Sequence, residues 1–295
     1  YLTAAFTEGT GTDGNDLCHD SEFERGFVFF DDVFPMEVRA TRTKDATAPV
    51  QPTPAGAWAT LQKAGNWIDT HANDQFMLFI RLRDLKKPAP LPYYGNGFIG
   101  QGRTPDPVDI YDTAITYVDK QISAFIDHLH EIPEEKRPVL VITSSHGFDF
   151  TEPGRGAWRR GGPPRCTLHE SALRIPLLLD IPNRYGSAQN GLVSLKDVGV
   201  TLAAIAGTAF PHPVEGVDIL GHSSAQECLS MVGNPVSLSM RTPRWRFTWQ
   251  SGLTPFTLER VGNAEVVEFL DMERYRSNLA PVDNMIREPR LAQSF

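Results

Sequence analysis

The middle of the chain carries the pattern that most restricts the fold, an apolar strand, a long amphipathic helix and a second apolar strand. Asp109 is placed to cap the start of the helix, and Pro133 prevents its continuation. The runs 76–80 and 138–143 on either side are short and continuously apolar, which is typical of buried strands. The apolar face of the helix is spaced by four, three, four, three and four residues: Tyr111, Ile115, Val118, Ile122, Phe125 and Leu129.

The same alternation of strands and helices continues on both sides of this unit. A capping-box pattern at Ser194 and Asp197 starts one of the further helices, and Gly207 ends it. Such alternation is typical of an α/β fold with parallel strands. The further segments are apolar runs at 1–6 and 173–179, read as strands, and helical patterns at 57–69 and 195–205.

The end of the chain follows a different pattern. Residues 244–249 and 256–261 alternate in polarity around a turn at Ser251 and Gly252, which predicts antiparallel strands. We therefore predict an α/β three-layer sandwich with a central, mainly parallel mixed sheet. It would form a domain over residues 1–234, and a small antiparallel α+β subdomain would follow over residues 235–295.

Composition narrows the class of protein. Of the 295 residues, 41% are hydrophobic and 22% are charged, as in ordinary globular chains. The net charge of -8 argues against binding to nucleic acid or to an anionic membrane surface. The longest apolar runs have five residues, far short of the roughly 20 that a transmembrane helix needs. Cys18, Cys166 and Cys228 are too widely spaced for a disulfide framework or a zinc site.

Polar side chains follow the predicted strands at the points where these strands end. Because α/β sheets bind ligands at the carboxyl ends of their strands, these residues could line one anion-binding cleft. Local cations are what a sulfate or phosphate ester needs for recognition. Taken singly, each of these residues is more typical of a solvated loop than of a binding site, and it is their convergence at strand ends that favours a site. The candidates are Lys86 and Lys87 after 76–80, Ser145 and His146 after 138–143, and Arg165 and His169 in the following loop.

These residues lie in segments that resemble, in order, the sulfatase branch of the alkaline phosphatase superfamily. Tyr111–Asp119 is close to the family's "YDA-x-I-x-YVD", and Val139–Gly147 resembles "L-V-V-x-TSDHG". The resemblance implies hydrolysis of sulfate or phosphate esters near a bound divalent metal, with calcium expected. Further segments with family patterns are 1–6, 23–32, 76–88, 165–176 and 192–207.

The resemblance also assigns roles to individual residues. Ser145 stands where the family has a metal-ligating Asp, and a hydroxyl is a weaker ligand for a hard cation than a carboxylate. Lys86 stands at a His that contacts the ester, and Arg165 stands at the active-site Lys. The implied roles are catalytic for Lys86, His146 and Arg165, substrate-binding for Lys87 and His169, and metal-ligating for Ser145 and His146.

The family's nucleophile is a formylglycine made in a C/S-x-P-x-R motif, and this motif does not occur in the 295 residues. The resemblance implies that it lies upstream of Tyr1, where the chain opens directly on an apolar strand. We therefore expect a sulfatase-like chain without its N-terminal strand and nucleophile segment. Such a chain would be inactive alone but part of a complete sulfuric ester hydrolase.

Two other functions agree with the same residues. Loss of the acidic ligand at Ser145 would suit a pseudo-hydrolase that binds anions or lipid headgroups. A metal-dependent phosphatase or phosphotransferase would differ only in its nucleophile. The expected substrate of the hydrolase is a small-molecule or glycan sulfate ester, and the resemblance favours a periplasmic or secreted protein.

Overall fold

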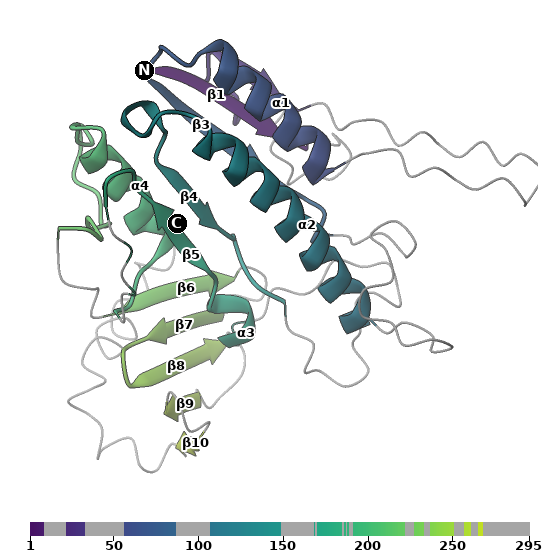
Figure 1. The fold of residues 1–295 in the computed structure, drawn as a ribbon. Coiled ribbons are helices and arrows are strands. Elements are labelled where there is room, and N and C mark those ends of the chain that lie inside the picture. Colours follow the sequence, from purple (N-terminus) through teal and green to yellow (C-terminus); the bar gives the residue numbers. More distant parts are fainter. Residues whose placement is uncertain are drawn as a thin grey trace, which may run out of the picture. The chain divides into compact units, whose positions relative to one another are not determined.

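A computed structural model of the chain divides into two compact units (Figure 1). The first contains Tyr1–Leu140 with Asp180–Arg184, and the second contains Val141–Leu179 with Tyr185–Phe295. The structure describes residues 1–8, 22–32, 56–86, 107–148, 168, 170–184, 186, 188, 191–221, 227–232, 237–250, 257–260 and 265–267.

The first unit is built on a parallel three-stranded sheet. Strand β1 (Leu2–Thr7) lies between β2 (Phe29–Asp31) and β3 (Phe76–Arg81), and it runs parallel to both. Ala5 in β1 is aligned with Phe30 in β2 and with Phe79 in β3. The predicted parallel arrangement of the strands at 1–6 and 76–80 is therefore confirmed.

Two helices cover one face of this sheet (Figure 1). Helix α1 spans Ala57–Thr70, and α2 spans Pro107–His130, followed by the 3-10 helix η2 (Glu134–Lys136). Their apolar stripes meet the sheet in a core of buried side chains: Ala4, Phe6, Leu61, Ala64, Ile68, Phe125 and Leu129.

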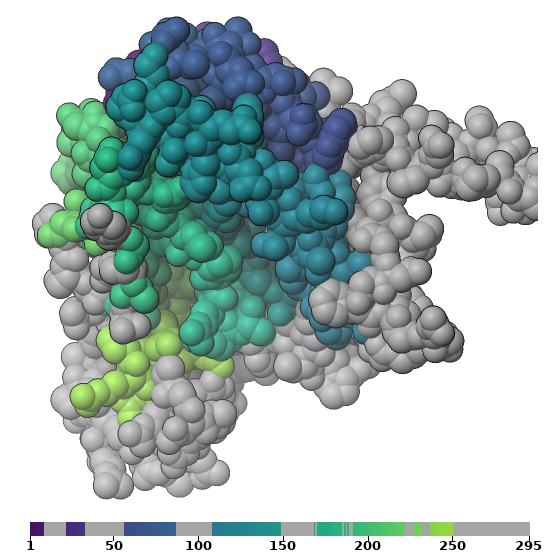
Figure 2. Space-filling view, in the orientation of Figure 1, coloured from purple at the N-terminus to yellow at the C-terminus, as the bar shows by residue number. Residues whose placement is uncertain are grey.

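Helix α2 starts earlier than the sequence pattern predicts. Its first residue is Pro107, so Asp109 lies in the first turn and not at the cap. Proline is favoured at a first helical position because its fixed φ suits the helix and its missing N–H has no partner there. Figure 2 shows α2 at the molecular surface, which agrees with the exposed Asp119 and Lys120. No helix among the described residues is long and apolar enough to cross a bilayer.

The other face of the first sheet carries aromatic side chains. Phe30 and Phe79 flank Ala5 in the neighbouring strands, so they lie opposite the face that holds Ala4 and Phe6. The ring of Phe23 lies 5.2 Å from that of Phe79 and 6.2 Å from that of Phe30. The turn at residues 22–26 thereby covers this face of the sheet, and one layer of packing lies on each side of the strands.

Strands β4 (Leu140–Thr143) and β5 (Leu177–Asp180) pair with each other, and all but Leu140 and Asp180 belong to the second unit. The strand predicted over 173–179 begins only at Leu177. Helix α3 (Glu170–Leu173) precedes it, because the N–H of Arg174 bonds to the carbonyl of Glu170 at 2.8 Å and closes a helical turn.

Helix α4 (Leu195–Ile205) in the second unit forms as predicted. Asp197 supplies its half of the capping box, since its Oδ2 accepts a hydrogen bond of 2.8 Å from the N–H of Ser194. Gly207 has a φ of 68°, the left-handed conformation that lets a glycine follow a helix end.

The chain ends in an antiparallel sheet. Its strands are β6 (Cys228–Val232), β7 (Ser237–Arg241), β8 (Trp245–Gln250), β9 (Thr257–Arg260) and β10 (Glu265–Val267), which pair in chain order. The predicted antiparallel pairing of 244–249 with 256–261 is confirmed by β8 and β9. The proposed domain boundary between residues 234 and 235 stays a prediction.

Candidate functional site

The turn that follows β4 holds the clearest candidate, His146. Ser145 and His146 are exposed, while Ser144 is half-buried and its Oγ donates to the carbonyl of His146 at 2.7 Å. The Nδ1 of His146 lies 2.9 Å from the carbonyl oxygen of Gly147. A carbonyl can only accept, so Nδ1 carries the hydrogen of this contact. The other ring nitrogen, Nε2, remains as the one that can meet a ligand.

The backbone of this turn is held on both sides of His146. The N–H of Gly147 donates to the carbonyl of Ala172 at 2.8 Å, and Thr143 Oγ1 donates to the carbonyl of Pro176 at 2.9 Å. A Cβ on Gly147 would lie 2.1 Å from the carbonyl oxygen of Ser171. Glycine is therefore required at this position, because any side chain would push α3 away from the turn.

Replacing Gly147 with Ala should lower the free energy of unfolding by about 1–3 kcal/mol, the usual cost of overpacking. The obstructing atom is a backbone oxygen, which cannot rotate away as a side chain would. Urea denaturation of both proteins measures the difference. Gly186→Ala is the matched control, because its added Cβ meets nothing within 4 Å. Equal effects of the two substitutions would contradict this account of the turn.

In the first unit, Lys86 lies in a turn after β3 and is half-buried. The turn is closed by the N–H of Lys86, which donates to the carbonyl of Arg83 at 2.8 Å. This agrees with the prediction that Lys86 follows the carboxyl end of a parallel strand. The role of Lys86 at an ester stays a prediction.

A buried carboxyl group lies at the same ends of β1 and β3. Glu8 is 1% exposed, and its two carboxyl oxygens accept hydrogen bonds from Thr60 Oγ1 at 2.9 Å and from the N–H of Arg83 at 2.8 Å. The pKa of Glu8 is raised to about 7, first by burial and second by the charge of Asp84, while the two hydrogen bonds and the Arg83 charge act in the opposite direction. Glu8 was not among the candidate residues predicted from the sequence, although it lies two residues after the first predicted strand.

Asp84 joins this carboxyl cluster to helix α1. Its Oδ2 accepts a hydrogen bond of 2.8 Å from the N–H of Ala57, the first helical residue. Gly56 has a φ of 70°, and a Cβ there would lie 2.4 Å from Oδ1 of Asp84. Glu8 and Asp84 therefore hold the start of α1 against the sheet, which is a structural task.

The described residues cover the predicted site in part. Lys86 belongs to the first unit, and Ser145 and His146 belong to the second. Lys87, Arg165 and His169 lie outside the described residues. The assignment of these six residues to one site stays a prediction.

The predicted metal site can be tested on the chemistry of its donors. Calcium takes six to eight oxygen ligands, and it favours carboxylates. Ser145 and His146 offer one hydroxyl and one imidazole, and no group of three or more His, Cys, Asp or Glu residues that could hold a metal occurs in the described parts of the chain. This pair by itself does not fit calcium, so calcium binding stays a prediction.

Solved structures share the fold of this chain. A 2-O GAG sulfatase matches with a TM-score of 0.64 and 14% identity, over 100% of this chain and 73% of its own. A phosphonate monoester hydrolase from Silicibacter pomeroyi matches with a TM-score of 0.62 and 15% identity, over 99% and 78%. A protein in the alkaline phosphatase superfamily from Vibrio parahaemolyticus matches with a TM-score of 0.60 and 15% identity. This match covers 98% of this chain and 65% of the Vibrio protein. The predicted α/β fold class is confirmed.

The chain thus spans about two thirds of the length of the Vibrio protein. None of the curated proteins compared with the chain matches it. A family model described as Sulfatase matches residues 17–208, which is well over half of the chain and includes the turn that presents His146. The chain therefore belongs to the sulfatase family.

Proposed function

We propose that this chain binds a sulfate or phosphate ester at the turn formed by residues 144–147, as part of a sulfuric ester hydrolase. The observation that carries the proposal is His146, which is exposed directly after β4 within the segment that matches the sulfatase family. Its Nδ1 is engaged by the Gly147 carbonyl, so Nε2 is the ring nitrogen proposed to meet the anion.

The imidazole of His146 suits two steps at such an ester. When protonated, Nε2 donates a charge-assisted hydrogen bond to an ester oxygen, which is stronger than a neutral one. When the ester bond breaks, the same group can give its proton to the departing alcohol oxygen. The contact with Gly147 would keep the ring in one orientation for both steps.

The other members of the proposed site come from the family resemblance. Lys86 and Arg165 are proposed as cations that offset the negative charge of the ester, and Lys87 and His169 as further substrate contacts. A divalent metal would add charge neutralisation when bound. The described donors do not fit calcium, so the proposed steps use the side chains of this chain alone.

A glycan sulfate ester is the proposed substrate. One structural relative is a 2-O GAG sulfatase and another is a phosphonate monoester hydrolase. Sulfate esters and esters of phosphorus acids are therefore both to be tested. The formylglycine motif does not occur in the 295 residues. Binding is therefore the property to measure on this chain, and turnover is to be measured on the full-length gene product.

Ser145 favours a second candidate function, anion binding without hydrolysis. The family resemblance places a carboxylate where this chain has a hydroxyl, and a hydroxyl holds a hard cation less well. A pseudo-hydrolase would therefore bind sulfate or a phosphate headgroup and turn over neither ester. A phosphatase would hydrolyse phosphate esters and leave sulfate esters intact.

Titration of the isotope-labelled chain with inorganic sulfate, followed by NMR of the histidine rings, tests the binding. We expect a saturable shift of the His146 resonances. His146→Ala should weaken sulfate binding by about 10- to 100-fold, the effect of losing one hydrogen bond to a charged group. His212→Ala is the matched control, since His212 is also an exposed histidine of the second unit and should leave the affinity unchanged.

Turnover of aryl sulfate and aryl phosphate by the full-length gene product separates the candidates. Cleavage of the sulfate ester supports the hydrolase, and cleavage of the phosphate ester alone supports the phosphatase. Sulfate binding at His146 without turnover supports the binding module. If neither sulfate nor phosphate shifts the His146 resonances and no ester is cleaved, the proposed function is wrong.

A further inference from the structure

The turn that presents His146 rests on the segment that begins with α3. The N–H of Gly147 bonds to the carbonyl of Ala172, and Thr143 Oγ1 bonds to the carbonyl of Pro176. One contact precedes His146 in the chain and the other follows it. The position of α3 therefore determines where the backbone of His146 lies.

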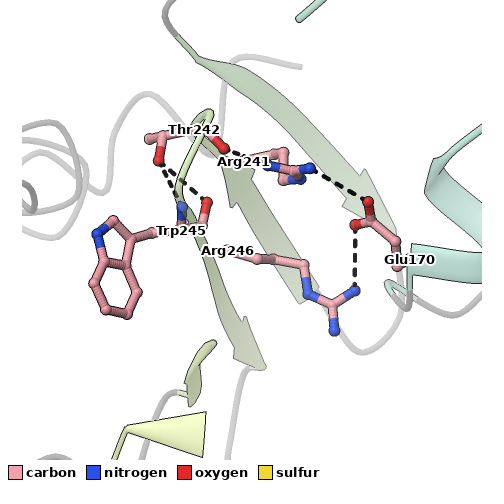
Figure 3. Close-up of polar contacts among 5 residues, drawn as sticks. All are labelled: Glu170, Arg241, Thr242, Trp245 and Arg246. Carbon is pink, nitrogen blue, oxygen red and sulfur yellow. Dashed lines mark hydrogen bonds and ion pairs between the residues drawn. The ribbon is translucent and has the colours of Figure 1, made fainter. Parts of the chain in front are cut away.

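Helix α3 is in turn tied to the C-terminal sheet through its first residue, Glu170 (Figure 3). Oε1 of Glu170 lies 3.4 Å from Nη2 of Arg241 in β7, and Oε2 lies 3.8 Å from Nη1 of Arg246 in β8. The Arg246 side chain is 10% exposed and that of Arg241 is 21% exposed, whereas that of Glu170 is 40% exposed, so solvent screens the two arginine charges less than the charge of Glu170. One carboxylate thus faces two guanidinium groups.

The two arginines are held in place by their own strands. Arg241 and Arg246 are directly opposite each other in the antiparallel pair of β7 and β8, where like charges repel. The turn between them is closed by the N–H of Thr242, which donates to the carbonyl of Trp245 at 2.8 Å, and Arg241 Nη1 donates to the carbonyl of Thr242. The carboxylate of Glu170, on the four-residue helix α3, offsets this repulsion.

We propose that Glu170 is a positioning residue for His146, with Arg241 and Arg246 as its anchors. The arginines hold Glu170, Glu170 holds α3, and α3 holds the turn at Thr143 and Gly147. The effect on ester binding rests on the proposed function, whereas the effect on the placement of His146 does not. All the residues that make these contacts belong to the second unit.

Glu170→Gln tests the proposal because it removes the charge and keeps the shape of the side chain. We expect the His146 ring resonances to shift at constant pH while those of His212 stay in place. The affinity for inorganic sulfate should fall by about tenfold, the smaller effect seen when an outer partner of a binding residue is removed. Arg241→Gln should act in the same direction, and the double variant should add little to either single variant.

Glu215→Gln is the matched control, because it breaks an exposed ion pair of the same unit, between Glu215 and Lys196 at 3.1 Å. It should change neither the His146 resonances nor the affinity for sulfate. If folded Glu170→Gln has the His146 resonances of the unmodified chain, the proposal is wrong. Should Glu170→Gln fail to fold, Arg241→Gln decides by the same two measurements.

The outcomes separate this inference from the proposed function. If the unmodified chain binds neither sulfate nor phosphate, the proposed function fails, and the His146 resonances alone decide whether Glu170 is a positioning residue. If the unmodified chain binds sulfate and Glu170→Gln changes neither measurement, the proposed function stands and the positioning role is overturned.

Discussion

Replacing Glu8 with Gln should stabilise the protein in neutral and alkaline solution and leave its stability in acid almost unchanged. The pKa of Glu8 in the folded protein is about 7, above the ordinary value of 4.5, so folding favours its protonated form. Stability is therefore lost as the pH rises from the lower value through the higher one. Above pH 7, this shift in pKa lowers the free energy of unfolding by about 3 kcal/mol.

A glutamine can keep both hydrogen bonds of Glu8. Its amide oxygen can accept from the N–H of Arg83, and its amide nitrogen can donate to Thr60 Oγ1, as a protonated carboxyl group would. The gain comes from removing a charge that is buried beside Asp84. Urea unfolding of the unmodified chain and of Glu8→Gln, at about pH 4 and about pH 8, measures this gain in the free energy of unfolding.

Glu22→Gln is the control for Glu8→Gln, because Glu22 is an exposed acid of the same unit and is paired with Arg25 at 2.9 Å. It should change the pH dependence of unfolding little, as expected of a surface ion pair. If the difference in stability between the unmodified chain and Glu8→Gln is the same in acid and in alkali, Glu8 does not titrate as inferred.

Asp197→Ala is expected to cost about 3 kcal/mol of unfolding free energy, since it removes the charged acceptor of two part-buried hydrogen bonds, each worth about 1.5 kcal/mol. Asp197 is 2% exposed. Its Oδ2 accepts from the N–H of Ser194 at the start of α4, and its Oδ1 accepts from the N–H of Val217 at 3.0 Å. One carboxylate thus caps the helix and also fixes a segment 20 residues later in the chain.

Asp197→Asn separates the two contributions, because the amide keeps one acceptor oxygen and should cost about half as much. The control is Lys196→Ala at the neighbouring position, which removes an exposed ion pair with Glu215 and should cost at most about 1 kcal/mol. Denaturant midpoints of the three variants provide the test. A cost for Asp197→Ala no greater than that for Lys196→Ala would refute the role of Asp197.

The sequence by itself predicts the local elements and the family. The apolar stripe that includes Val118 and Phe125 predicts α2, and the Ser194–Asp197 pattern predicts the start of α4, because both patterns depend on residues within a few helical turns. The placement of His146 after a strand is also local, although the residues of that strand are half-buried or exposed and not buried as predicted. It follows from the apolar run that ends at Thr143.

Two elements begin at other residues than the sequence predicts. The causes are local, but a pattern of apolar residues does not show them. The strand predicted from Leu173 begins at Leu177, because a single helical turn at α3 comes first. A turn of four residues is too short to show a helical period. The start of α2 at Pro107 likewise depends on the geometry of proline and not on an apolar stripe.

Only the tertiary structure decides which distant residues act together. Glu8 meets Thr60 and Arg83 across 52 and 75 positions, and Glu170 meets Arg241 across 71. A single sequence shows the charge of each residue but not its burial or its partner, and burial and partners determine both the pKa of a carboxyl group and the strength of an ion pair. The family, and the position of candidate residues such as His146 after predicted strands, could thus be predicted from the sequence. The buried carboxyl at the end of β1 and the link from the C-terminal sheet to His146 required the fold.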